Sequence, residues 1–461
     1  MFELPQKQID QEDFRMRETR NAQASIFDRY AEHEFGRQLE RLSALLDCHP
    51  EILELIAKDF DKANVASTGA CGLSIESIFR CLVLKQITQL SYQKLAFHLC
   101  DSATYRTFVR LKIKQSPSKS ALQATVRRVQ PETLAQIHRL VMSDWLAQGQ
   151  LSLDTLRMDS TVVDSHIAPP LDSGLLEDGI RVLSRLMANS KACTGMKMRF
   201  VDQRKRSKSL AFRIFHAKKT EKNRLYPELI RCAQVALRQT AKAIDKVRLH
   251  ASDEPRSRTW IDKVVHYRAL LLRVIDQTER RVIHGEKVPA SEKLVSLFEP
   301  HTDIIVKGMR AVQYGHKVNL ATEQHGFVTY FNIEDGNPAD TTLYQPVLDA
   351  CQAVYRTTPD AVVADGGYAS GDNVRQARQR GVKRAVFNKP VGLGLHEMGV
   401  KRKTFDALRD FRAGIEGNIS ELKRVFGLRR ANWKGRDGFC AYVWSSVLSY
   451  NLMRWVRLCP G

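Results

Sequence analysis

DAVVADGGYASGD, residues 360–372, combines a short apolar run with an aspartate and a glycine pair. The run 361–364 predicts a buried strand, because four apolar residues between turn-forming residues are typical of a strand inside a sheet. The strand leads directly into Asp365, and sites in α/β folds form where strands end. The alternative is that Asp365, which precedes Gly366 and Gly367, is only a turn residue.

The segments around this strand continue an α/β pattern through the C-terminal third of the chain. HKVNLATE (316–323) and FVTYFNIED (327–335) predict two strands joined as a hairpin. A helix that Asp340 could cap follows them. Beyond the strand that precedes the glycine pair, we expect a helix over 373–380 and a strand over 383–387.

A further strand is predicted well before this α/β region. LSLDTLRMDSTVVDSHI (151–167) has strand-like alternation, and the following Ala-Pro-Pro ends the pattern. Asp159 is expected at the end of this strand, with Asp164 beyond it. Taken alone, Asp159 is equally well explained as a turn or cap residue.

A third acidic residue lies in FRAGIEGNISELKR (411–424), which predicts part of a long helix. On a helical wheel Arg412, Glu416 and Lys423 fall within about 40° of one another. Taken alone, Glu416 is better explained by an ion pair with Arg412 four residues earlier. The two glycines are expected opposite the apolar stripe, where they would permit close approach of another backbone or of DNA.

The three carboxylates together suggest a metal site. Asp159, Asp365 and Glu416 would repel one another at one sheet edge unless cations lay between them. Mg²⁺ fits such a site, because it binds a few carboxylates and keeps water and substrate phosphates as its other ligands. Two such ions about 3.5–4 Å apart can activate a water or a 3′-hydroxyl and stabilise the departing oxygen in phosphodiester chemistry.

In this order the segments resemble bacterial insertion-sequence transposases of the DDE type, and most closely their ISNCY-like group. The resemblance covers most of the chain and is carried by LSIESIFRCLVLKQITQLSYQKLAFHL, RMDSTVVDSHIAPPLDSGLLEDGIRVLSRL, GHKVNLATEQHGFVTYFNIEDGNPADTTL, VVADGGYASGDN and FRAGIEGNISELKRVFGLRR. The last segment is similar to a motif in which Tyr, Arg, Glu and Lys are separated by two, three and six residues. Arg412, Glu416 and Lys423 match it, whereas Arg409 stands where the family has tyrosine.

The resemblance implies an α/β fold with an RNase H-like catalytic core in which the three carboxylates hold two Mg²⁺ or Mn²⁺ ions. It implies that Arg412 and Lys423 contact DNA phosphates at the element end, and Arg409 is a candidate for a further contact. The implied reaction is cleavage at that end, followed by attack of its 3′-hydroxyl on target DNA. The implied partners are terminal inverted repeats, target DNA and a second copy of the chain, since two ends must be paired.

The N-terminal region is predicted to be helical and to bind DNA. Apolar stripes on both sides of a break at 89–91 have the layout of a helix-turn-helix module. In SPSKSALQATVRRV, Ser118 or Ser120 could cap a helix that carries Lys119, Arg127 and Arg128. This helix either reads DNA or is one more surface helix of a bundle.

The charge of the chain points to nucleic acid. Its 72 Lys and Arg against 51 Asp and Glu give a net charge of +21, which attracts polyanions. Within 197–231, twelve cations oppose three acids, so Lys205 and Arg206 are candidate DNA contacts. Interleaved aromatic residues suit a surface that follows a phosphate backbone, and the alternative is a solvated helix face.

These patterns predict three parts. Residues 1–150 form a helical, helix-turn-helix-like DNA-binding domain, 151–168 with 300–461 form the RNase H-like core, and 169–299 form a basic helical insertion. The longest charge-free stretch, 439–453, is too short and too polar to span a membrane and is predicted to be a buried helix.

The remaining expectations concern location and rival functions. No export segment is expected, and the scattered cysteines suggest a reducing cytoplasm, where the resemblance implies a bacterial nucleoid-associated protein. Two alternatives to a transposase stay open: an RNase H-like DNA nuclease without strand transfer, and a DNA-binding relative that has lost catalysis.

Overall fold

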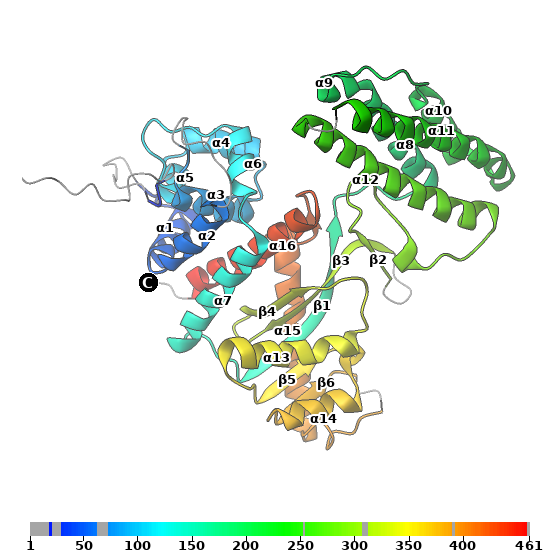
Figure 1. The fold of residues 1–461 in the computed structure, drawn as a ribbon. Helices are drawn as coiled ribbons and strands as arrows, with labels where there is room; N and C mark the ends of the chain where they lie inside the picture. The colour runs from blue at the N-terminus through cyan, green and yellow to red at the C-terminus, as the bar shows by residue number, and fades with distance from the viewer. Residues whose placement is uncertain are drawn as a thin grey trace, which may run out of the picture.

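The fold was analysed in a computed structural model that describes residues 18–20, 29–61, 72–251, 254–306, 312–389 and 392–458. Its central element is one mixed sheet, with helices from both ends of the chain packed around it (Figure 1). The strands are β1 (Thr155–Ser165), β2 (Asp303–Ile305), β3 (Gln313–Thr322), β4 (Val328–Ile333), β5 (Ala361–Ala364), β6 (Arg384–Phe387) and β7 (Arg430–Ala431).

The strand order is that of an RNase H-like core. The path runs β2-β3-β1-β5-β6, while β4 pairs with β3 and β7 pairs with β1. The pairs of β3 with β1 and with β4 are antiparallel, whereas β5 and β6 run parallel to β1. The predicted fold class, the hairpin and the short buried strands are therefore confirmed.

Helices cover both faces of this sheet. On one face lies α15 (Arg402–Arg424), and on the other lie the short 3-10 turn η4 (Asp340–Leu343) and α13 (Tyr344–Tyr355). A 3-10 turn, η5 (Gly366–Tyr368), and α14 (Gly371–Gln379) connect β5 to β6. Neighbouring residues of β1 point to opposite faces, so this strand presents side chains to both helical layers.

Before β1 the described residues form the helices α1 (Glu34–Asp47), α2 (Glu51–Asp61), α3 (Ile75–Thr88), α4 (Tyr92–Asp101), α5 (Ala103–Val109), α6 (Lys119–Val126) and α7 (Pro131–Ala147). Gln89 ends α3 in the left-handed region and Ser91 caps α4, so two helices joined by a short turn occupy the segment for which a helix-turn-helix layout is predicted. Ser118 caps α6. The helix ends earlier than predicted, so that Arg127 is its C-cap and Arg128 lies beyond it.

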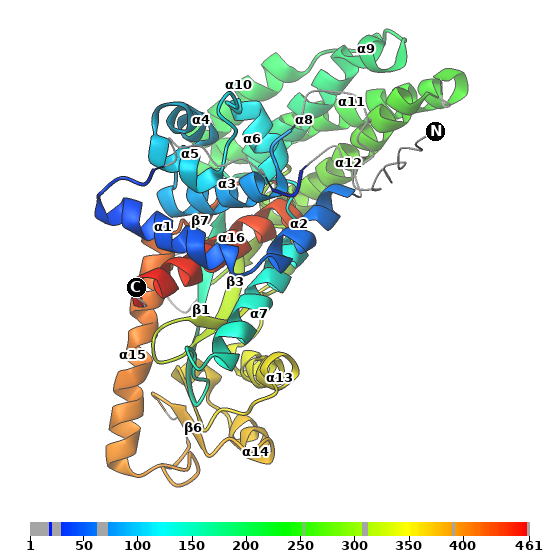
Figure 2. The same ribbon diagram turned by 90° about the vertical axis from the view of Figure 1, so that its left-hand side faces the viewer.

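The last described helix, α16 (Arg436–Leu458), lies between the N-terminal helices and the sheet (Figure 2). The Gln86 side chain of α3 donates to Ser446 Oγ of α16 and to the Phe426 carbonyl, both at 2.6 Å. One hydrophobic core therefore includes both the N-terminal helices and the sheet. The prediction of a buried helix is confirmed, and no helix in the described part of the chain could cross a membrane.

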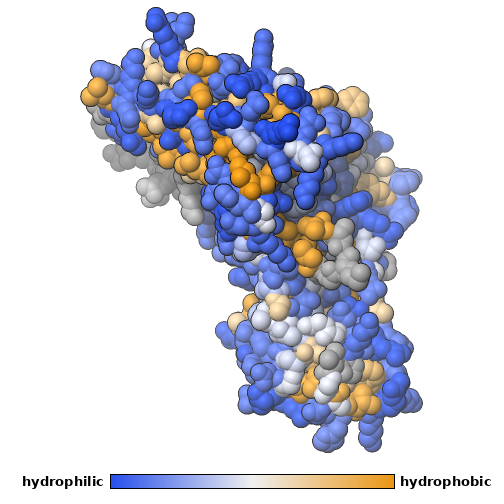
Figure 3. Space-filling view, turned by 90° about the vertical axis from the view of Figure 1, so that its right-hand side faces the viewer, coloured by the Kyte–Doolittle hydropathy of each residue, from blue (hydrophilic) through white to orange (hydrophobic). Residues whose placement is uncertain are grey.

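The basic segment forms a helical body with its own core. It consists of α8 (Asp172–Ala188), α9 (Ser190–Thr194), α10 (Arg204–His216), α11 (Lys219–Ala251) and α12 (Pro255–Thr278), followed by the short turns η2 (Glu279–Ile283) and η3 (Ala290–Glu292). Their buried residues make a second hydrophobic cluster. Figure 3 shows this body at the top, with a mainly hydrophilic surface interrupted by apolar groups.

Candidate active site

Two aspartates lie at matching positions of neighbouring parallel strands. Met158 of β1 pairs with Ala364 of β5, so Asp159 and Asp365 are each the next residue along, on strands about 4.8 Å apart. The backbone of Asp365 is still extended. The two carboxylates therefore stand side by side where β5 ends.

The predicted strand end at Asp159 is wrong. β1 continues to Ser165, because β3 pairs with it as far as Asp164 opposite Gly315 and β7 pairs with it beyond. Asp159 is thus a mid-strand residue and Asp164 is also part of the strand. The two aspartates nevertheless lie at an edge of the sheet, because the neighbouring strand β5 ends at Ala364 while β1 continues to Ser165.

Helix α15 brings Arg412 and Glu416 to this edge. Arg412 Nη2 lies 2.7 Å from Asp159 Oδ2, and its Nη1 lies 2.9 Å from Glu416 Oε1. The Arg412 side chain is buried, whereas that of Glu416 is 67% exposed. The i, i+4 pair is therefore confirmed, and the same guanidinium also links Glu416 to the first aspartate.

A buried arginine fixes α15 against the sheet. Arg157, two residues before Asp159 on the same face of β1, donates to the Phe411 carbonyl at 2.9 Å and to Asn418 Oδ1 at 3.0 Å. A Cβ atom on Gly414 would lie 2.0 Å from Arg157 Nη1. The position predicted for this glycine, away from the packed face, is therefore wrong, because the buried side of α15 includes polar contacts as well as the apolar stripe.

A second polar cluster lies on the opposite face of the sheet, directly behind the aspartates. Asp340 Oδ1 accepts from Ser160 Oγ at 3.1 Å and pairs with Lys317 Nζ at 2.5 Å. A Cβ on Gly367, in the turn after Asp365, would lie 2.8 Å from Asp340 Oδ2. Asp340 therefore does not cap α13 as predicted. It holds β1, β3 and the turn after the second aspartate together.

Tyr368 completes this cluster, and its hydroxyl donates to Asn319 Oδ1 at 3.0 Å. Burial raises the pKa of Tyr368 well above its usual value, and the charges of Asp340, Asp159 and Asp365 raise it further. The phenol therefore remains a hydrogen-bond donor at neutral pH. Sequence reasoning missed this cluster, although a lysine inside the predicted strand 316–323 was a signal that a buried carboxylate must accompany it.

Lys423 lies elsewhere on α15. It is close to Asp164, whose pKa is raised by burial and lowered in part by Arg430, Lys423 and Arg429. Asp164 is five residues along β1 from Asp159, which corresponds to about 16 Å of strand. Arg412 and Lys423 therefore face different parts of β1.

The donor types fit a hard divalent cation, because three carboxylates supply oxygen ligands. Among the described residues, however, no group of three or more acidic, histidine or cysteine side chains is arranged to hold a metal ion. Arg412 accounts for this at Asp159 and Glu416, since its guanidinium already bridges them. Asp159, Asp365 and Glu416 remain the residues that would hold Mg²⁺ or Mn²⁺.

The other predicted DNA contacts lie on α15, on α10 and around α6. Arg409 is exposed and pairs with Asp406 and Asp410. Lys205 is exposed on α10, where Arg206 lies 3.4 Å from Glu228. Lys119, Arg127 and Arg128 surround α6 on the N-terminal side of the molecule.

Comparison with known families agrees with this geometry. A family described as "Transposase DDE domain" matches residues 305–452, a range that includes Asp365 and Glu416. A family described as "Transposase domain (DUF772)" matches residues 27–128. Together the two matches cover more than half of the chain. Neither the curated proteins nor the solved structures gave a match.

Proposed function

Since the chain belongs to the DDE transposases of insertion sequences, we propose that it binds the terminal inverted repeats of its element, cleaves the DNA there and joins the 3′-hydroxyl ends to target DNA. The observation that carries this proposal is the placement of Asp159 and Asp365 on adjacent parallel strands, with Glu416 linked to Asp159 through Arg412. These three carboxylates are the proposed catalytic residues.

In this mechanism, the three carboxylates would hold divalent cations at the edge where β5 ends, and the reacting phosphate would bind there through those cations. Two bound Mg²⁺ or Mn²⁺ ions would activate the attacking oxygen and stabilise the leaving one. Arg412 balances the charge of Asp159 and Glu416 before substrate arrives. With bound cations balancing Asp159 and Glu416, the Arg412 guanidinium would be available to bind a phosphate, for which its planar geometry is suited.

The remaining parts supply DNA binding. We assign residues 1–150 and the insertion 169–299 to contacts with DNA, with the catalytic core in 151–168 and 300–461. Lys119, Arg127 and Arg128 would contact one stretch of duplex and Lys205 and Arg206 another. Lys423 and Arg409 would contact phosphates along α15, and two copies of the chain would pair the two ends.

Asp365→Asn is the direct test of the catalytic site. The substitution removes a negative charge but preserves size, so we expect loss of Mg²⁺-dependent cleavage by at least about 100-fold while binding to the same duplex is kept. The matched control is Asp372→Asn, at an exposed acid of α14 that pairs with Arg375. Normal cleavage by Asp365→Asn would refute the site.

A pre-cut end separates the transposase from a plain nuclease. When the wild-type protein is given a duplex with a free 3′-hydroxyl at the element end and a target plasmid, we expect joined products in the presence of Mg²⁺. Cleavage of intact ends without any joining would identify a nuclease of the same fold.

A further inference from the structure

A cavity with both polar and apolar walls lies between the N-terminal helices and the loop after β7, and none of the three carboxylates lines it. Its volume is about 370 Å³, and its walls come from the end of α3, the start of α4, α6 and the loop between β7 and α16. Lys85, Lys119 and Arg127 line it, and no acidic residue does. The positive charge of the lining therefore comes from the N-terminal helices, and the distant loop after β7 adds the neutral Asn432 and Trp433.

Lys85 is the unusual member of this lining. Its side chain is only 5% exposed, and its ammonium group lies 5.1 Å from the centre of the Tyr92 ring. Within the described residues no carboxylate lies at ion-pair distance from it, and burial lowers its pKa to about 8. A buried lysine without an anionic partner destabilises a fold, which suggests that an anion from outside completes this site.

Two further donors in the same wall have no acceptor. Trp433 is 5% exposed, its Nε1 has no hydrogen-bond partner, and the buried Tyr92 hydroxyl has none either. Buried donors are rarely left unpaired in folded proteins. The helices α4 and α6 also begin at this cavity, with their N-caps Ser91 and Ser118, and the positive ends of helix dipoles favour anions.

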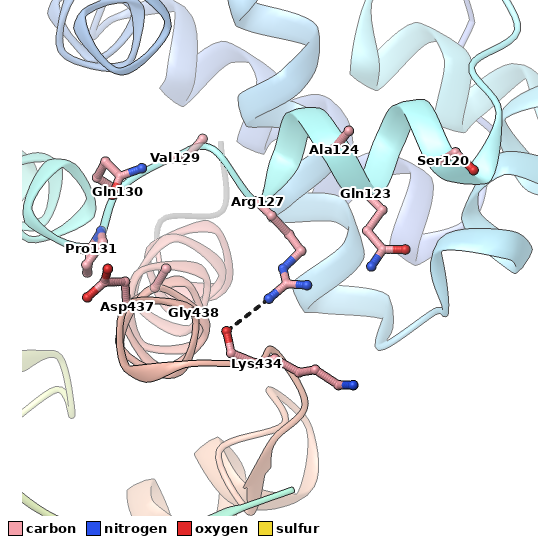
Figure 4. A pocket seen from close by; sticks show the side chains of 11 residues that line it. Ser120, Gln123, Ala124, Arg127, Val129, Gln130, Pro131, Lys434, Asp437 and Gly438 are labelled. Atoms are coloured by element: carbon pink, nitrogen blue, oxygen red, sulfur yellow. Dashed lines mark hydrogen bonds between the residues drawn. The ribbon is translucent and has the colours of Figure 1, made fainter. Parts of the chain in front are cut away.

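The cavity continues into a second one of about 590 Å³, with which it shares Gln123 and Arg127. Figure 4 shows this second cavity, where Arg127 reaches across from α6 and donates to the Lys434 carbonyl at 3.2 Å. Arg127 also lies over the Trp433 ring. The first cavity offers amide, hydroxyl and cationic groups, which are the types that contact a DNA backbone. The second also has an acidic residue, Asp437, in its lining, so the phosphate is assigned to the first cavity.

We propose that this junction is a binding site for a backbone phosphate of duplex DNA, with Lys85, Lys119 and Arg127 as its cations and Trp433 as a neutral donor. The inference rests on the proposed function, since it takes DNA as the substrate. It adds a phosphate contact made jointly by the N-terminal helices and the core, so that one bound strand holds both regions together.

The first test is the salt dependence of binding by the full-length protein. A labelled duplex of arbitrary sequence suffices, because phosphate contacts carry no sequence information. For Lys85→Met we expect roughly tenfold weaker binding at low salt and a slope of log affinity against log salt that is smaller by about 0.9, the effect of one lost phosphate contact. Lys85→Met keeps the apolar stem, so the fold is retained.

The matched control is Lys383→Met, which removes an exposed lysine paired with Asp360 at the opposite end of the sheet. For this control, the slope of log affinity against log salt is expected to equal that of the wild type. An unchanged slope for Lys85→Met would overturn the proposal, whatever the outcome for Asp365→Asn. Conversely, normal cleavage by Asp365→Asn would refute the carboxylate site without changing the slope expected for Lys85→Met. Failure of this proposal can therefore be distinguished from failure of the proposed active site.

The second test uses the reactivity of the Lys85 amine. The wild-type protein is treated with an amine-acylating reagent, and the rate at which Lys85 is modified is measured by mass spectrometry. The measurement is made on the protein alone, with duplex, and with inorganic phosphate at the same phosphate concentration. We expect the duplex to slow modification of Lys85 at least fivefold, and inorganic phosphate to have less effect. Shielding by inorganic phosphate but not by the duplex, or shielding by neither, would overturn the proposal.

Discussion

At the scale of single residues, Arg412 balances the charge of two of the three carboxylates at the sheet edge. Its guanidinium is buried and contacts both Asp159 and Glu416, and its Nε atom has no hydrogen-bond partner. A cation supplied by the chain itself relieves the repulsion between carboxylates, which would otherwise destabilise the fold without metal. The spacing of the third motif alone revealed only the ion pair within the helix.

Lys85 predicts a measurable pH dependence of stability. Its pKa is about 8 in the folded protein and about 10.5 when unfolded, so between these values the unfolded state binds more protons. Stability from this group therefore rises as the pH rises from about 8 to 10.5. At pH 7 the buried charge costs roughly 3 kcal/mol.

Lys85→Met removes this cost. We expect the variant to be more stable than the wild type at pH 7, by roughly 3 kcal/mol in urea unfolding, and the difference to shrink as the pH approaches 10.5. Other groups titrate alike in both proteins and cancel from the comparison. Parallel stability profiles for the two proteins over this range would contradict the argument.

At the scale of elements, the position of α15 depends on its close approach to the Arg157 side chain of β1 as well as on apolar packing. Gly414 faces the Arg157 guanidinium, while Gly417 in the same helix faces open space. Both are interior helix positions, where glycine is less favourable than alanine by roughly 1 kcal/mol. The two glycines therefore differ only in what surrounds them.

This difference predicts opposite effects of the same substitution. Gly417→Ala should raise the free energy of unfolding by roughly 0.5–1 kcal/mol. Gly414→Ala should lower it by about 1–3 kcal/mol, because the new methyl group displaces Arg157 from its contacts with α15. Urea unfolding of the two variants and the wild type measures both, and a stabilised Gly414→Ala would show that α15 does not need this close approach.

The elements also show what the sequence could predict. The strand 361–364 and the position of Asp365 follow from local pattern, because an apolar run and a turn define both. The end of β1 could not be predicted from local pattern, because it depends on pairing with β3, whose residues lie more than 140 positions later. The contacts of Asp340 and Arg157 were missed for the same reason: each side chain is held by partners that are distant in sequence.

At the scale of the whole molecule, the described residues form two separate hydrophobic cores. The N-terminal helices, the sheet and α16 share one, while α8 to α12 enclose the other. Units with separate cores unfold as separate cooperative transitions when the contact between them is small. The long gap between Asp159 and Asp365 led to the prediction of an inserted helical segment, but the sequence did not indicate that the N-terminal helices and the sheet would be packed into one body.

Differential scanning calorimetry of two core variants tests this arrangement. We expect two transitions for the wild type. Leu229→Ala, in the core of the insertion, and Leu448→Ala, in the core around α16, each delete a buried side chain and should each cost about 2–5 kcal/mol. Each variant should lower the temperature of one transition only, and a single transition shifted by both would contradict two independent cores.

The bond between Gln86 and Ser446 joins residues 360 positions apart, which has a consequence for synthesis on the ribosome. At about 5–20 residues per second, translation needs on the order of half a minute to produce α16 after α3 has emerged. Throughout that interval the apolar surfaces of the N-terminal helices that α16 will cover remain open to solvent. The nascent chain is therefore exposed to chaperone capture and aggregation until α16 is complete, and a truncated product that ends before α16 has an incomplete main core.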